Sequence, residues 1–257
     1  MSRTSRRIRA AIRRVPGARL AVTNARRAVT RLGYVARRLG FGAAFGDHVF
    51  TEIYKNNAWG DADSRSGVGS NLIATATVRS EIERLFEDLA VKSILDLPCG
   101  DFHWMRHVAL PPDLQYTGAD IVADLIKKNA ELYGNERIAF RKLDLLADPL
   151  PAADLILCRD CLVHFSFADA ARAILNLKRS RPKYLLITHF TGNRENWDIE
   201  TGGWRPLNLM APPFNFPPPL RVMNERCDAE NGKYRDKSLA LYELPQIPAI
   251  AVRCSTR

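Results

Sequence analysis

Hydrophobic positions follow two alternating spacings between about residues 78 and 190. Short apolar runs typical of buried strands lie at 93–97, 115–119, 138–144, 154–158 and 184–190. Apolar residues at helical spacing occupy the stretches 78–89, 103–110, 120–133 and 167–175. We expect Asp101 to cap the second of these helices and Asp120 to cap the third. Because strands alternate with helices, the pattern predicts a parallel sheet covered on both faces.

The alternation stops after residue 190. A stretch rich in Pro, Trp and Asn runs to about 219, and two more strand-like runs follow near 220–227 and 238–244. The pattern therefore predicts a seven-stranded α/β core over 93–257, with an insertion at about 191–219. We expect 46–92 to form a cap segment before this core and 1–45 to form a basic helical arm.

Positive charge is concentrated at the start of the chain. The 257 residues carry a formal net charge of +10, yet residues 1–40 hold twelve Arg and no Asp, Glu or Lys. The rest of the chain, with 26 basic and 28 acidic residues, is close to neutral. Net charge therefore says little about the substrate of the core.

The basic arm also carries an apolar stripe, at Ile8, Ile12 and Val15 and again at Ala25, Val29 and Leu32. This pattern is typical of amphipathic helices that bind an anionic membrane surface, and peripheral membrane contact through residues 1–40 is our hypothesis. A nucleic-acid-binding arm fits less well. A mitochondrial transit peptide and a solvated tail fit the same composition.

The rest of the composition predicts a cytoplasmic protein, peripheral to the inner face of a membrane if the arm binds there. No run approaches the roughly 18 apolar residues that cross a bilayer. The charged N-terminus lacks the apolar region of a secretory signal. The five cysteines are scattered, as is usual for reduced intracellular thiols.

Acidic side chains follow the ends of four successive predicted strands: Asp96, Asp120, Asp144 and the pair Arg159-Asp160. In an open α/β sheet, ligands bind beyond the carboxyl ends of the strands. One such Asp would be an ordinary helix cap, whereas the set at successive strand ends indicates a ligand site.

The loop after the first strand separates two classes of cofactor. A dinucleotide requires Gly-x-Gly-x-x-Gly at that point, but residues 98–102 read Pro-Cys-Gly-Asp-Phe. S-adenosylmethionine has no phosphate and requires less of this loop. An acid at the end of the second strand can accept both ribose hydroxyls, and Asp120 lies 20 residues after Gly100. Asp144 is placed to meet the adenine amine.

Residues 93–190 resemble the class I S-adenosylmethionine-dependent methyltransferases. The strings "LDLPCGDFHWM", "YTGADIVADLI", "RDCLVHFS" and "GGWRPLNL" are similar to those of a bacterial subgroup, over about residues 59–243. The family's usual acidic-x-Gly-x-Gly-x-Gly loop here has its first and third glycines replaced. The resemblance implies a Rossmann-like, doubly wound, mostly parallel seven-stranded sheet with helices on both faces. It also associates the chain with glycan-like or other small polar acceptors.

The resemblance assigns cofactor binding to residues at the strand ends: Asp96, Pro98, Gly100, Asp101, Phe102, Asp120, Ile121, Asp144, Leu145 and Arg159. Within the loop, Pro98 is expected to stiffen the turn and Gly100 to admit the cofactor. Phe102 is expected to pack under the loop where a glycine usually lies. The segment 56–71, with Trp59, Gly67 and Gly69, is expected either to close over the site or to be a surface linker.

Transfer of a methyl group to a hydroxyl requires a base. Asp160 and His164, on the loop after the fourth strand, are the candidate catalytic residues, and the near-neutral pKa of an imidazole suits His164. His189 is a weaker candidate. Cys158-x-x-Cys161 has the spacing of a redox or zinc pair, but no second Cys/His pair is near in sequence, so we expect no metal.

The insertion after the fifth strand supplies candidate acceptor-binding residues. Loops at this end of a sheet commonly shape the acceptor pocket. Trp204 is suited to stack on a sugar or ring, and Arg205 and Asn208 to hydrogen-bond polar groups.

The sequence as a whole predicts an S-adenosylmethionine-dependent methyltransferase, with O-methylation of a glycan-like or other small acceptor as the expected reaction. A second hypothesis is a non-catalytic S-adenosylmethionine-binding scaffold, attached to a membrane or nucleic acid through its arm. A nucleotide-sugar or nicotinamide enzyme is a third, which the loop disfavours.

Overall fold

The computed structural model describes residues 43–192 and 195–248. The chain divides into two compact units, 1–45 and 46–257, and the strands of the sheet all belong to the second. The predicted basic arm and its membrane contact fall on residues 1–42, outside the described part. Within the described part, none of the helices combines the length and apolar character that a membrane span requires.

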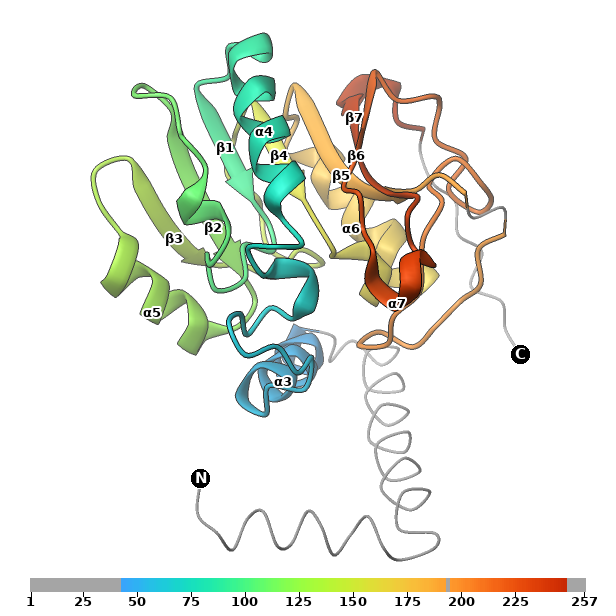
Figure 1. Cartoon of the computed structure of the whole chain (residues 1–257), viewed down its shortest axis with the longest axis horizontal. Helices are drawn as coiled ribbons and strands as arrows, with labels where there is room; N and C mark the ends of the chain where they lie inside the picture. The colour runs from blue at the N-terminus through green and yellow to red at the C-terminus, as the bar shows by residue number, and fades with distance from the viewer. Residues whose placement is uncertain (1–42, 193–194, 249–257) are drawn as a thin grey trace, which may run out of the picture. The chain divides into compact units, whose positions relative to one another are not determined.

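The core is one seven-stranded sheet in the order β3-β2-β1-β4-β5-β7-β6 (Figure 1). Strands β1 to β5 run parallel, and β7 lies antiparallel between β5 and β6. The strands are β1 (Ser93–Asp96), β2 (Gln115–Asp120), β3 (Ile138–Lys142), β4 (Leu155–Cys158), β5 (Tyr184–Phe190), β6 (Arg221–Asn224) and β7 (Lys237–Glu243). This confirms the predicted Rossmann-like, doubly wound, mostly parallel sheet.

Helices cover both faces of the sheet. Alternate residues of each strand point to opposite faces, so Ile94 packs with α4 and Leu95 packs with α6. The helices are α3 (Ala43–Lys55), α4 (Ala76–Leu89), α5 (Ala123–Tyr133), α6 (Phe167–Arg179) and α7 (Ala229–Gly232), with single 3-10 turns η1 (Val68–Ser70), η2 (Met105–His107), η3 (Leu162–His164) and η4 (Leu244–Gln246). α5 packs beside β2 and β3.

Four local predictions are wrong. The helix expected over 103–110 is the single turn η2. Its N-cap is Trp104, and Asp101, which accepts the His103 N–H at 3.4 Å, lies too early to cap it. α5 begins after Val122, and Asp120 lies too early to cap it. Leu175, placed on the buried stripe of α6, is 49% exposed.

Substitutions of a buried and an exposed apolar residue test the packing of α4 against the sheet. Ile82 is fully buried, so Ile82→Ala should lower the free energy of unfolding by about 2–5 kcal/mol, because it removes contacts and leaves a cavity. Ile73→Ala is the matched control: Ile73 is 88% exposed, and we expect a change within about 0.5 kcal/mol. Urea unfolding of both variants measures the difference, and equal losses would contradict this packing.

Candidate functional site

The predicted strand-end residues meet along one edge of the sheet. Asp96 and Asp120 are the last residues of β1 and β2. Asp144 lies two residues beyond β3, and Arg159-Asp160 directly follows β4. Because these four strands are parallel and in register, their carboxyl ends share one edge.

The loop after β1 uses its backbone amides within the chain. The N–H of Cys99 donates to the oxygen of Ala119 at 2.8 Å, and that of Phe102 donates to Cys99 at 3.4 Å. The Gly100 N–H donates to Asp120 Oδ2 at 3.2 Å, and the Asp101 N–H donates to Ser66 Oγ at 3.0 Å. All four amides between 99 and 102 are therefore already paired.

Gly100 is required at its position for two reasons. Its φ is +54°, in the left-handed region that side chains disfavour. A Cβ atom there would lie 2.1 Å from Ser66 Oγ. The group that approaches Gly100 closely is thus a serine of this chain, whereas the sequence led us to expect the cofactor.

Phe102 packs under the loop, as predicted. It is buried against the rings of Tyr116, Tyr133 and Phe140, with centroid distances of 5.1, 5.4 and 5.1 Å. A buried aromatic ring thus anchors the end of the loop. Pro98, at the start of the loop, follows a cis peptide bond.

Asp120 is a buried carboxylate bound by backbone amides. Besides the Gly100 N–H, it accepts the Val122 N–H at 3.1 Å through Oδ1. Burial raises the pKa of Asp120 to about 6, although these amides oppose the shift. Among the described residues no basic side chain forms an ion pair with it.

Asp96 lies deeper in the same edge. Its Oδ2 accepts a hydrogen bond from the Tyr116 hydroxyl at 2.6 Å. Burial raises the pKa of Asp96 to about 7, against the opposing effects of the Tyr116 hydroxyl and the nearby Arg159 guanidinium. Within the described part of the chain, two buried carboxylates thus lie near each other without an ion-pair partner of their own.

Asp101 attaches the segment before the sheet to the loop. Its carboxylate accepts hydrogen bonds from Ser64 Oγ at 3.0 Å, the Arg65 N–H at 2.7 Å and Ser66 Oγ at 3.2 Å. Both oxygens are therefore engaged, which argues against the direct cofactor contact expected of Asp101. Part of segment 56–71 is thus bound to the loop after β1, which argues against a free surface linker.

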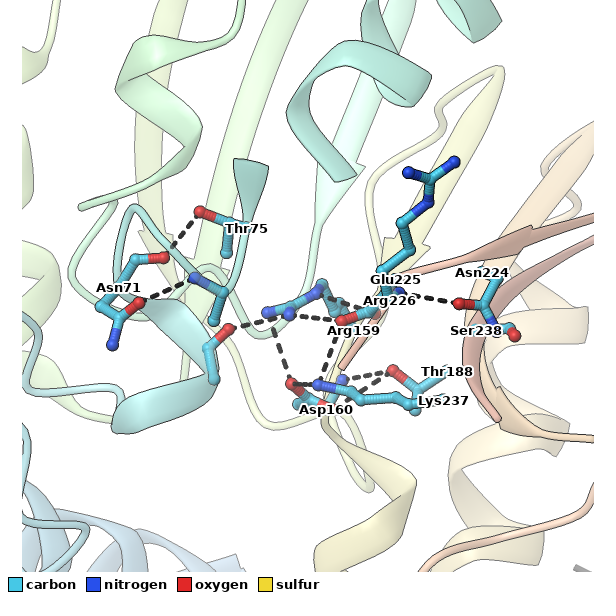
Figure 2. Close-up of polar contacts among 12 residues, drawn as sticks. Asn71, Thr75, Arg159, Asp160, Thr188, Asn224, Glu225, Arg226, Lys237 and Ser238 are labelled. Atoms are coloured by element: carbon cyan, nitrogen blue, oxygen red, sulfur yellow. Dashed lines mark hydrogen bonds and ion pairs between the residues drawn. The ribbon is translucent and has the colours of Figure 1, made fainter. Parts of the chain in front are cut away.

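Four charged side chains form a second feature, which we call the charge cluster: Arg159, Asp160, Glu225 and Lys237 (Figure 2). Arg159 and Glu225 pair twice, from Nε to Oε1 at 3.1 Å and from Nη2 to Oε2 at 2.7 Å. Lys237 Nζ lies 2.6 Å from Asp160 Oδ2 and 3.2 Å from Glu225 Oε2. The two positive and two negative charges balance.

The cluster changes the expected role of Arg159. Besides the pair with Glu225, its Nη1 lies 3.3 Å from Asp160 Oδ2 and its Nη2 donates to the Gly69 carbonyl at 2.8 Å. Arg159 therefore joins the ends of β4 and β6 to segment 56–71. These contacts argue against a direct cofactor contact for Arg159, which stays an untested prediction.

Asp160 is held in one conformation. Its φ is +51°, and its N–H donates to Thr188 Oγ1 at 2.7 Å. Although burial favours the neutral acid, Lys237 and Arg159 lower the pKa of Asp160 to about 2. The side chain is thus an anion at neutral pH and a poor proton acceptor, which disfavours it as the general base.

His164 has the properties of a base. Its Nδ1 lies 2.8 Å from the carbonyl oxygen of Gly203, so Nδ1 carries the proton and Nε2 keeps its lone pair. Burial lowers the pKa of His164, which leaves the ring neutral at pH 7. The ring packs against Trp59 at a centroid distance of 5.1 Å. His189, in contrast, is buried and accepts the Leu209 N–H through Nδ1.

The three predicted acceptor residues have different surroundings. Trp204 is 42% exposed and packs edge-on against Tyr234 at a centroid distance of 4.9 Å, so it can meet a ligand. Arg205 is fully buried, which contradicts an acceptor-binding role for its side chain. Asn208 Oδ1 accepts the Met210 N–H at 2.9 Å and shapes a turn.

The remaining predicted residues lie around the β2 and β3 ends. Ile121 is half-buried against α5, and Leu145 is buried in the core. Asp144 is buried, and its Oδ1 accepts the Leu146 N–H at 2.8 Å. Their contact with a cofactor stays a prediction.

The cysteine pair lies inside the core. Cys158 and Cys161 are both buried, and their mutual contact together with burial raises the pKa of the Cys161 thiol, which makes it unreactive. Across residues 43–192 and 195–248, no three His, Cys, Asp or Glu side chains are grouped so that they could hold a metal ion.

Sequence reasoning missed Glu225, Lys237 and the serine pair Ser64 and Ser66. Glu225 directly follows β6 but lies inside the predicted run 220–227, and Lys237 begins β7 just before the predicted run 238–244, so neither stood at a predicted strand end. They reach the end of β4 only because β7 lies antiparallel beside β5. The serines have a weak signal, since they lie in a Gly/Ser-rich segment, but nothing in the sequence pairs them with Asp101.

Comparisons with known proteins give partial likenesses to methyltransferases. No family model and no curated protein matches the chain. An N-methyltransferase NodS from Bradyrhizobium japonicum, solved with S-adenosyl-L-homocysteine, is 16% identical over 54% of this chain and 73% of its own, with a TM-score of 0.44. An O-methyltransferase family protein from Burkholderia thailandensis is 23% identical over 46% and 39%, with a TM-score of 0.38.

Human N-acetylserotonin methyltransferase, solved with S-adenosylmethionine, is 18% identical over 45% of this chain and 34% of its own, with a TM-score of 0.37. The present chain therefore spans less than two thirds of the human and Burkholderia proteins. At these TM-scores the function has to be inferred from the residues of the site.

Removing one charge from the charge cluster tests whether water is excluded from this edge of the sheet. Lys237→Met leaves Asp160 and Glu225 with one cation between them, so we expect a loss of about 3–5 kcal/mol in the free energy of unfolding. Lys233→Met is the control, because Lys233 is exposed and, among the described acidic side chains, pairs only with Glu230; we expect its unfolding to match that of the wild type. Urea unfolding compares them, and a fully stable Lys237→Met protein would show that the cluster is hydrated.

Proposed function

We propose that this protein is an S-adenosylmethionine-dependent methyltransferase that methylates oxygen on a glycan-like or other small polar acceptor. The observation that carries the proposal is that the backbone amides of the loop after β1 all donate hydrogen bonds within the chain. A dinucleotide pyrophosphate binds free backbone amides at this position. Here the amides of residues 99–102 already donate to Ala119, Asp120, Ser66 and Cys99.

The charge of the site favours a cofactor that carries positive charge. Asp96 and Asp120 are buried carboxylates with raised pKa values of about 7 and 6. Such a pair repels phosphate and gains from a cation nearby. S-adenosylmethionine has a sulfonium and an ammonium group and lacks phosphate, so the donor set fits it.

Four positions would hold this cofactor. Asp120, at the end of β2, would accept the ribose hydroxyls, and Asp144 with Leu145 would border the adenine. The loop with Gly100 would border the methionyl group. When bound, the cofactor supplies a methyl group on a positively charged sulfur.

The chain's own contribution to the chemistry is the removal of a proton and the orientation of the acceptor. His164 is neutral, with a lone pair on Nε2 that can take the proton of an acceptor hydroxyl. Asp160 stays anionic and can stabilise the imidazolium that forms. The exposed ring of Trp204, next to Gly203, offers a stacking surface for a sugar ring.

The cofactor assignment is tested by titrating S-adenosylhomocysteine into the protein in a calorimeter. We expect Asp120→Asn to weaken binding by roughly 10- to 100-fold, because a hydrogen bond to a charged group contributes about 1.5–3 kcal/mol. Asn keeps the shape but only one acceptor oxygen, so one of the Gly100 and Val122 amides loses its partner, and thermal unfolding of the variant checks that the fold is kept. Asp124→Asn is the matched control, because Asp124 is exposed on α5 and its loss should leave affinity unchanged.

A parallel titration with NADH tests the competing cofactor class. Binding of NADH and not of S-adenosylhomocysteine would overturn the proposal. Equal affinity of the wild type and Asp120→Asn for S-adenosylhomocysteine would remove Asp120 from the site.

A further inference from the structure

We propose that Arg205 is a positioning residue for His164: it holds the turn η3 and keeps the imidazole in the neutral tautomer with a free Nε2. The inference deepens the proposed function, because it rests on His164 acting as the proton acceptor. In this view the arginine of "GGWRPLNL" positions His164 and does not bind the acceptor.

Arg205 binds the backbone of the turn that carries His164. Its Nη1 donates to the carbonyl oxygens of Leu162 at 3.1 Å and Val163 at 3.3 Å. Its Nε donates to the carbonyl oxygen of Trp197 at 2.8 Å, and its guanidinium lies over the Phe167 ring at 5.1 Å. One side chain thus joins η3, the start of α6 and the segment after β5.

The residues before Arg205 bind His164 directly. The Gly202 N–H donates to the His164 carbonyl at 2.8 Å, and the Arg205 N–H donates to the Val163 carbonyl at 3.0 Å. Between these two bonds, the Gly203 carbonyl accepts a hydrogen bond from His164 Nδ1–H. The segment 202–205 therefore fixes both the backbone and the ring of His164, and Arg205 fixes the segment.

Stability alone does not explain an arginine at this position. Its side chain is fully buried, and its Nη2 has no hydrogen-bond partner among the described residues. Nor does any carboxylate in that part of the chain form an ion pair with it; the exposed Asp198 acts only at longer range. Burial of an unpaired charge costs free energy, and an apolar side chain would fill such a space at less cost. The bonds that offset this cost are those to the carbonyl oxygens of Trp197, Leu162 and Val163, so the geometry ties the buried charge to η3.

The charges around His164 agree with this role. Burial has the largest effect on the pKa of His164 and lowers it. The Gly203 hydrogen bond and the anion of Asp160 raise it, whereas Lys237 and Arg205 lower it. Two cations lie near His164. Lys237 forms an ion pair with Asp160, whereas Arg205 forms no ion pair with any described carboxylate, so its charge acts on the imidazole without being neutralised.

The test follows the His164 ring by NMR in the full-length protein with 15N-labelled histidine. His164→Gln identifies its signals among the five histidines. In the wild type we expect a single Nδ1–H tautomer and a pKa below the usual value for histidine. Arg205→Met should shift the titration of His164 to higher pH, because a positive charge is removed. Arg205→Lys should keep the titration near that of the wild type but populate the Nε2–H tautomer, because the forked hydrogen bonds are lost.

Arg221→Met is the control, since Arg221 is partly exposed and pairs with Asp88; the His164 signals should not change. If Arg205→Met fails to fold, Arg205→Lys decides the outcome. An unchanged tautomer in Arg205→Lys, or an unchanged titration in a folded Arg205→Met, would overturn the inference. Because this readout needs neither cofactor nor acceptor, its failure is distinguishable from a failure to bind S-adenosylhomocysteine.

Discussion

The constraint on which this site depends is the crowding of carboxylates at one buried edge of a parallel sheet. Asp160 and Glu225 are neutralised by Arg159 and Lys237 within hydrogen-bonding distance. Asp96 and Asp120 have no such partner among the described residues, and burial raises the pKa of each. The charges of Asp160 and Glu225 are thus neutralised within the protein. Asp96 and Asp120, in contrast, would be stabilised by a bound cation. The proposed cofactor, with its sulfonium and ammonium groups, supplies that positive charge.

The same division separates the proposed base, His164, from the anion of Asp160. Asp160 is tied to Lys237 and cannot readily take a proton, whereas His164, four residues later, remains neutral and keeps Nε2 available. The proposed contribution of Arg205 extends this arrangement: a buried cation opposes the effect of Asp160 on the imidazole. In this proposal the insertion after β5 does more than cover the sheet, because it carries the groups that hold His164.

Much of the fold was predictable because strand and helix periods are local properties of the sequence. The run 184–190 became β5 with the same bounds, and the strand-end acids share one edge because parallel strands must place them there. The roles of Arg159, Arg205 and Asp101 were not predictable. Each depends on partners distant in sequence, such as Glu225, Leu162 and Ser64, which only the folded chain brings together. A polar side chain at a strand end has the same sequence signal whether it faces a ligand or another part of the protein.

The central claim is that the carboxyl edge of β1 and β2 binds S-adenosylmethionine, and a crystal structure of the complex with S-adenosylhomocysteine tests it most directly. The account predicts the ribose hydroxyls on the carboxylate of Asp120, with the Arg159–Glu225 pair unchanged. A ligand bound elsewhere, or an Asp120 that keeps only its amide partners while the ribose contacts other residues, would contradict it.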